Sequence, residues 1–147
     1  MYFIDREKID ANLQFLEKQL KLLSSQTSWS SDFDKAALER ICHVSIEIII
    51  DVGNAMIDGF IMRDPGSYED IIDILLDEKV IDKQEASGLK EVIWHRKELV
   101  QDYLDVNYEQ LIATFTTQKN NLHQFTINVR TYIKQELGPV TAFKPLQ

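Results

Sequence analysis

Residues 41–60 read ICHVSIEIIIDVGNAMIDGF, and they lie within the most apolar segment of the chain. Apolar side chains recur there at spacings of three and four residues, which is the period of one face of an α-helix. We expect that face to contain Leu38, Ile41, Cys42, Ser45, Ile49, Val52, Met56 and Phe60. Ser31 or Asp32 can cap the start of this helix, and Asp64-Pro65-Gly66 is expected to end it. The segment therefore predicts a long helix at the centre of the fold.

The opposite side of the same helix carries polar residues at helical spacing. These residues are His43, Glu47, Asp51, Asn54 and Asp58. Acidic side chains are costly at the centre of a bilayer, so we expect residues 44–62 to form a buried helix and not a membrane span. A polar stripe on a central helix also indicates a candidate cleft.

The remaining chain has the same helical period, and no run of residues alternates polar and apolar side chains as a strand would. Further helices are expected at residues 3–23, from 67 to 76, from 82 to about 105, and from 108 to 137, with caps at Ser67, Asp82 and Asn107. We predict an all-α, antiparallel helical bundle of four long helices plus one short helix. It forms a single domain over residues 1–137, followed by a C-terminal tail at 138–147.

Composition limits the possible functions. The chain has 147 residues, of which 44% are hydrophobic and 27% are charged, as is usual for one globular domain. Its single cysteine, Cys42, excludes an intrachain disulfide, and the acidic N-terminus does not resemble a signal peptide, so we expect a cytoplasmic protein. The net charge of −8 opposes general binding to nucleic acid. We therefore expect no DNA partner, and RNA contacts only within a local cleft.

Arg96 interrupts an apolar face of the helix expected from residue 82. That face contains Leu89, Val92, Ile93, Arg96, Leu99, Val100 and Tyr103. A guanidinium in apolar surroundings needs a partner because an isolated buried charge is very costly. Two interpretations follow: Arg96 forms a structural ion pair with Glu47 or Asp51, or it lines a cleft at a subunit interface. In the second case it holds a phosphate with two hydrogen bonds, while carboxylates of the central helix orient it.

Four stretches of the chain resemble the HepT-like proteins, the DUF86 group of the HEPN superfamily. They are Ala37-Leu-Glu-Arg40, Glu47-Ile-Ile-Ile-Asp-Val-Gly-Asn54, Ser67-Tyr-Glu-Asp70 and Arg96-Lys-Glu-Leu-Val-Gln-Asp-Tyr-Leu-Asp-Val106. The resemblance covers roughly residues 33 to 135 and preserves order and spacing. The family signature is Arg-Asn-x-Leu-Val-His-x-Tyr, and Arg96, Leu99, Val100 and Tyr103 match it. Lys97 replaces the Asn, and Gln101 replaces the His.

The resemblance implies a ribonuclease that acts as a dimer and needs no metal or other cofactor. Arg96 would stabilise the phosphate, and position 101 would supply the general acid or base for attack by the ribose 2′-hydroxyl. Glutamine cannot exchange a proton near neutral pH, so the expected loss is about 10²–10⁴-fold in rate. In such families an antitoxin with a nucleotidyltransferase fold transfers adenylyl groups to the tyrosine after the motif histidine. Here that tyrosine is Tyr103.

Other side chains could complete this site. His43 belongs to the polar stripe and can face the same cleft, whereas His95 lies about 120° from Gln101 on the helical wheel. Trp94, Lys97 and Gln101 share another face, which suits either a stacking and phosphate surface or ordinary packing. Three functions remain open: a toxin-type ribonuclease with weakened activity, a non-catalytic dimer that binds a nucleotide, RNA or a nucleotidyltransferase partner, and a dimer whose cleft is only structural.

Overall fold

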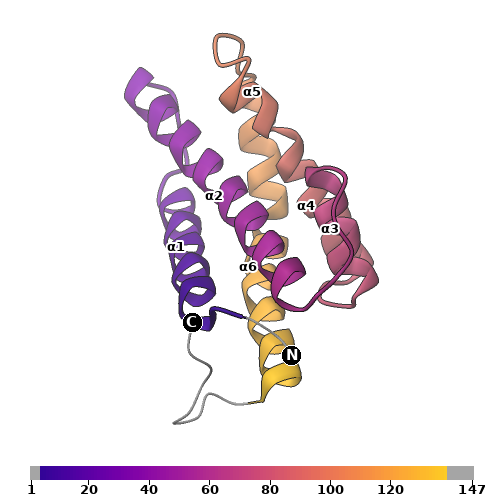
Figure 1. Ribbon diagram of the computed structural model, residues 1–147. Helices are drawn as coiled ribbons and strands as arrows, with labels where there is room; N and C mark the ends of the chain where they lie inside the picture. Colours follow the sequence, from indigo (N-terminus) through magenta and orange to yellow (C-terminus); the bar gives the residue numbers. More distant parts are fainter. Residues whose placement is uncertain (1–3, 139–147) are drawn as a thin grey trace.

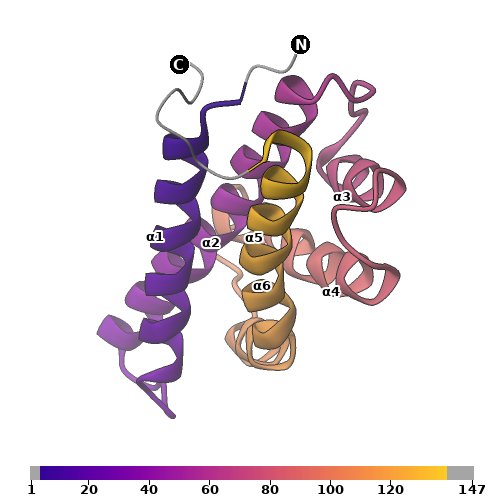
Figure 2. The ribbon, with the colours of Figure 1, turned by 90° about the horizontal axis from the view of Figure 1, so that it is seen from below.

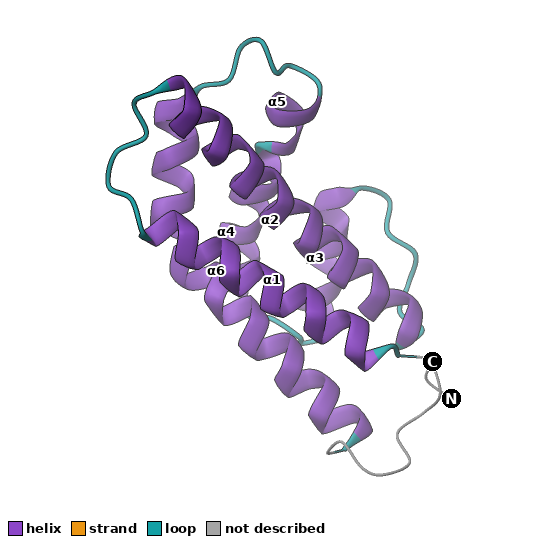
Figure 3. Cartoon of the chain, turned by 90° about the vertical axis from the view of Figure 1, so that its left-hand side faces the viewer, coloured by secondary structure: helices purple, strands orange, loops and turns teal. Residues whose placement is uncertain are grey.

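Helices provide all the regular secondary structure in residues 4–138, the part of the chain that this computed structural model describes (Figure 3). They are α1 (Arg6–Ser24), α2 (Asp32–Gly59), α3 (Tyr68–Asp77), α4 (Lys83–Trp94), α5 (Arg96–Val100) and α6 (Tyr108–Leu137). The predicted all-α bundle is therefore confirmed. Most of the predicted C-terminal tail, residues 139–147, lies outside the described part. None of the described helices combines the length and apolar character needed to cross a bilayer.

The long helices α1, α2 and α6 extend through most of the molecule, and α3 and α4 lie together on the side away from α1 (Figures 1 and 2). Helix α2 packs against α1, α3 and α5, while α6 packs against α1 and α4. All eight residues of the predicted apolar face of α2 are buried. Ile46, Ile48, Ile50 and Ile57 on other sides of α2 are buried as well, which confirms its central position.

The predicted caps are confirmed. Ser31 begins α2 in a reciprocal capping box with Asp34. The side chains of Ser67, Asp82 and Asn107 each accept a hydrogen bond from the backbone N–H three residues later, at 2.8–3.0 Å. These short-range bonds begin α2, α3, α4 and α6 at the positions that the sequence indicates.

The predicted end of α2 at Asp64-Pro65-Gly66 was wrong, because the helix already ends at Gly59. Ile61 adopts the left-handed conformation, with φ of 57°, and the N–H of Met62 donates to the carbonyl of Ile57 at 2.9 Å. This pattern is a Schellman closure, in which glycine is usual. Lys79 ends α3 in the same way, with φ of 62°. Neither residue type signals this conformation in the sequence.

The helix expected from residue 82 to about 105 is divided at His95 and ends at Val100. The His95 side chain is 1% exposed, and its Nδ1 and Nε2 atoms lie 2.6 Å from Glu98 and 2.9 Å from Thr114 of α6. Because the helix stops early, Tyr103 is in a loop and is 63% exposed. Its expected place on a packed apolar face was therefore wrong, since helical period assigns a face only while the helix continues.

Replacing Ile61 with glycine should stabilise the protein. A β-branched side chain in the left-handed region costs about 1–2 kcal/mol, and Ile61 is 70% exposed, so little packing is lost. Glycine adds backbone entropy to the unfolded chain, which offsets part of the gain. We expect a net increase of about 0.5–1 kcal/mol in the free energy of unfolding, measured by urea denaturation. Lys79→Gly is the matched variant, with a smaller increase expected, and a decrease for Ile61→Gly would contradict the strain.

Candidate functional site

Arg96 is the first residue of α5, and its side chain extends to α2. Its Nε donates to Glu47 Oε2 at 3.2 Å, and its Nη2 donates to Glu47 Oε1 at 3.1 Å. The two side chains are 22% and 34% exposed, so the ion pair lies near the surface and not in the core. These hydrogen bonds lower the pKa of Glu47 and raise the pKa of Arg96 from their ordinary values. Of the two carboxylates predicted as partners, Glu47 is the one in contact; Asp51 is exposed one turn further along α2.

Two more side chains join the ion pair from other parts of the chain. The guanidinium carbon of Arg96 lies 4.6 Å from the ring centroid of Tyr68, at the start of α3. His43, one turn before Glu47, places its Nε2 atom 3.4 Å from Glu47 Oε1. Side chains from α2, α3 and α5 thus meet around one guanidinium. Sequence reasoning missed Tyr68, although Ser67-Tyr68-Glu69-Asp70 was among the stretches that carried the family resemblance.

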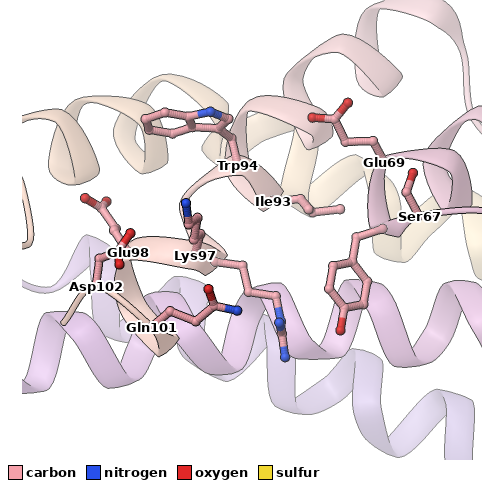
Figure 4. A pocket seen from close by; sticks show the side chains of 10 residues that line it. Ser67, Glu69, Ile93, Trp94, Lys97, Glu98, Gln101 and Asp102 are labelled. Atoms are coloured by element: carbon pink, nitrogen blue, oxygen red, sulfur yellow. The ribbon is translucent and has the colours of Figure 1, made fainter.

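A pocket of about 690 Å³ adjoins this cluster, between the start of α3 and the junction of α4 with α5 (Figure 4). Its lining residues are Ser67, Tyr68, Glu69, Ile93, Trp94, Arg96, Lys97, Glu98, Gln101 and Asp102. Arg96 and Gln101, the two key positions of the signature, therefore line the same space, together with Lys97. Tyr103 is not among the lining residues and lies exposed in the loop that follows.

The buried His95 and the partly exposed Glu98 hold the start of α5 in place. One oxygen of Glu98 contacts His95, and the other accepts a hydrogen bond from the backbone N–H of Asn107 at 3.2 Å. Glu98 thus connects the start of α5 to the cap of α6. His95 has both ring nitrogens occupied within the protein, so its contacts are structural. His43 is partly exposed beside Glu47, the residue that also pairs with Arg96. His43 is therefore the histidine that remains as a candidate for the chemistry of this site.

The arrangement can bind an anion but is limited in proton transfer. Glu47 occupies Nε and one N–H direction of Nη2, so the Nη1 end of Arg96 can donate to a phosphate oxygen. Gln101 at the end of α5 is exposed and can donate or accept a hydrogen bond, without changing its charge. Within residues 4–138, no group of three His, Cys, Asp or Glu side chains is placed to hold a metal ion.

Replacing Glu47 with glutamine should lower stability in a pH-dependent way. Because Arg96 lowers the pKa of Glu47 in the folded protein, the pair stabilises the fold above the ordinary carboxyl value, about 4.3. That contribution is lost as the pH falls through the lowered folded-state pKa. We expect Glu47→Gln to cost about 0.5 kcal/mol at pH 7, and the difference to vanish in acid, in urea unfolding measured across pH. Asp51→Asn is the matched control; a difference independent of pH would contradict the ion-pair explanation.

Comparisons with known proteins bear on the family and the fold of this chain. A family model described as Ribonuclease HepT-like matches residues 9–129. The chain is 52% identical over 144 residues to "Putative RNase YutE" of Bacillus subtilis (strain 168), a match that covers 98% of this chain and 100% of that protein. It also superposes on a solved structure of YutE, a cytosolic protein of unknown function from Bacillus subtilis. That match has a TM-score of 0.93 and covers 97% of this chain and 100% of the other.

More distant solved structures share the fold. One is a tri-AMPylated Shewanella oneidensis HEPN toxin in complex with MNT antitoxin, with a TM-score of 0.72, 17% identity, and coverage of 84% of this chain and 95% of that chain. Another, a toxin-antitoxin with AMP-PNP, has a TM-score of 0.73 and 16% identity, covering 84% and 96%. At these identities the likeness concerns the helical bundle alone. The family model and the Bacillus relative extend over nearly the whole domain, and on that basis the chain belongs to the family described as Ribonuclease HepT-like.

Proposed function

We propose that this protein is a toxin-type ribonuclease of a toxin–antitoxin pair, with a degenerate motif and weakened activity. The observation that carries the proposal is that Arg96 and Gln101, the first and sixth positions of the motif, line one open pocket. Family membership supports the reaction class. A solved neighbour described as a HEPN toxin in complex with its antitoxin supports the biological role.

In the proposed reaction, Arg96 contacts the phosphate that is attacked by the neighbouring ribose 2′-hydroxyl. The new bond joins the 2′-oxygen to phosphorus, and the bond to the 5′-oxygen of the next nucleotide breaks. Arg96 stabilises the negative charge that develops on the phosphate oxygens, and Gln101 contributes a hydrogen bond only. The loss of general acid–base catalysis at Gln101 then reduces the rate by about 10²–10⁴-fold.

Glu47 and His43 have orienting roles in this proposal. Glu47 holds the guanidinium flat against Tyr68, so that the free end of Arg96 is presented in a defined direction. With a proton on Nε2 toward Glu47, His43 leaves Nδ1 as an acceptor. Because His43 contacts Glu47 and does not itself line the pocket, it would accept the 2′-hydroxyl proton through water in the residual reaction. Lys97 and Asp51 adjust the charge around the cleft.

We further propose a homodimer packed through α2 and α5. The Arg96–Glu47 pair is partly exposed on this face, and a second copy packed beside it would bring two sites into one cleft. Sedimentation equilibrium tests this directly, with an expected mass twice that of the 17.1-kDa chain. A monomer at micromolar concentration would contradict the dimer and leave the pocket itself intact.

Tyr103 is the proposed modification point for a partner with a nucleotidyltransferase fold. Its side chain is 63% exposed in the loop after α5, so the hydroxyl is accessible to a second protein. Such a modification would add negative charge near the mouth of the pocket and repel RNA. A cytoplasmic location suits this role, and the Bacillus relative is described as cytosolic.

The central test is RNA cleavage without metal by the wild type, Arg96→Ala and Gln101→His. We expect slow cleavage of transfer or messenger RNA by the wild type and at least a hundredfold loss in Arg96→Ala, since one charge-stabilising donor supplies about that factor. Gln101→His should raise the rate by about 10²–10⁴-fold. Arg63→Ala, a cation outside the pocket, serves as the control. Cleavage that persists in Arg96→Ala would contradict the proposal.

A non-catalytic HEPN dimer that binds RNA, a nucleotide or a nucleotidyltransferase partner is the second candidate. The two hydrogen bonds between Arg96 and Glu47 favour it, because they occupy part of the group that a scissile phosphate needs. The same assay separates the two functions. Cleavage by Gln101→His alone, with an inactive wild type, would assign the natural protein to binding.

A further inference from the structure

Trp94 is the last residue of α4, and its indole is 58% exposed. The sequence left open whether this ring belongs to the core, and the structure excludes that. The ring instead forms a wall of the pocket that contains Arg96 (Figure 4). It also lines a second hollow of about 360 Å³ on the side of α6, which is bordered by His95 and Thr114. The exposed indole of Trp94 therefore borders both hollows.

The position of this ring is well defined. The imidazole of His95 lies 5.2 Å from Trp94, centroid to centroid, with the two rings nearly perpendicular at 85°. His95 is itself buried and held by Glu98 and Thr114. The indole therefore rests against a rigid support. Holding a binding group in place before the ligand arrives reduces the entropy lost on binding.

The charges around the ring limit a ligand to one or two phosphate contacts, because the pocket has only two cations among the described residues that line it and Arg96 is already paired with Glu47. Lys97 lies beside Trp94 in the pocket, and Arg96 lines the same space (Figure 4). Glu69, Glu98 and Asp102 oppose these two cations, although Glu98 is already bound to His95 and to the backbone of Asn107. A duplex, which presents many phosphates and no free base faces, fits this balance poorly. A single strand with one unstacked base fits it better.

We propose that Trp94 is a stacking platform for one base of single-stranded RNA, next to the phosphate that Arg96 holds. Lys97 contacts the adjacent phosphate. This inference rests on the proposed function, because it names the substrate contact of the same site. Every base has a π face, so the platform accepts any base and selects for unpaired RNA over duplex. Stacking on Trp94 supplies affinity for RNA that the acidic surface of the chain does not supply.

Fluorescence offers a direct test, because the chain has two tryptophans and the other one, Trp29, is buried. In a Trp29→Phe variant, all indole emission comes from Trp94. The probe is a short single-stranded oligoribonucleotide methylated at every 2′-oxygen, which cannot be cleaved during the titration. We expect saturable quenching by this probe, and little quenching by an oligomer of the same length that lacks bases.

An independent readout uses the anisotropy of the same probe carrying a fluorescent label. Trp94→Ala should weaken binding by about tenfold, the loss expected for one stacked base, and Trp94→Phe should recover part of it. Phe15→Ala removes an exposed aromatic ring from α1, outside the pocket, and should leave the affinity unchanged. The salt dependence of binding should correspond to one or two phosphate contacts.

The outcomes separate this inference from the proposed function. Equal affinity of Trp94→Ala and the wild type, with RNA cleavage intact, would overturn the stacking platform alone. Dissociation of a dimer in Trp94→Ala, with unchanged RNA affinity, would also overturn it and assign the ring to a protein interface. Absence of both RNA binding and cleavage in the wild type would reject the proposed function, and the platform with it.

Discussion

The burial of α2 is the constraint on which the rest of the structure depends. Its isoleucine, valine and methionine side chains point in nearly all directions, and removing them from water is the largest favourable contribution to folding. No single neighbour can cover such a helix. Helices α1, α3 and α5 pack around it, and α6 packs against α1 and α4 and reaches α2 through the Tyr108–Glu39 hydrogen bond. The charged positions of α2, Glu47 among them, lie where this cover is incomplete. One of those places is the candidate site.

The contacts of His95 connect the bundle to that site. A continuous helix from residue 83 would place Arg96 in an apolar seam, where its charge would be very costly. Instead α4 stops at Trp94, and the His95 imidazole is enclosed between Glu98 and Thr114 of α6. Arg96 then begins a new short helix and extends to Glu47 at the edge of the core. A buried, fully hydrogen-bonded histidine thus lies directly before the partly exposed arginine, where α4 ends and α5 begins.

The site holds the charge of Arg96 in a defined position but has little capacity for proton transfer. Arg96 keeps its charge under all relevant conditions and is oriented by Glu47 and Tyr68, whereas Gln101 has no proton to exchange. Such a pocket is better suited to binding a phosphate than to rapid catalysis that requires proton transfer. Trp94 is the last residue of α4 and Tyr103 lies in the loop after α5, and both side chains are exposed. Under the proposed function, these are the contact points for RNA and for the modifying partner.

The sequence by itself determined the features that depend on local spacing. Helical period placed the apolar face of α2, and the caps at Ser31, Ser67, Asp82 and Asn107 follow from short side chains that satisfy nearby N–H groups. The need for a charge partner left two interpretations of Arg96, an ion pair with Glu47 or Asp51, or a cleft at a subunit interface. Tertiary structure alone decided between these carboxylates, divided the helix at His95, and moved Tyr103 from a packed face to solvent. Those outcomes depend on contacts such as His95 with Thr114, whose partners are distant in sequence and leave no periodic signal along the chain.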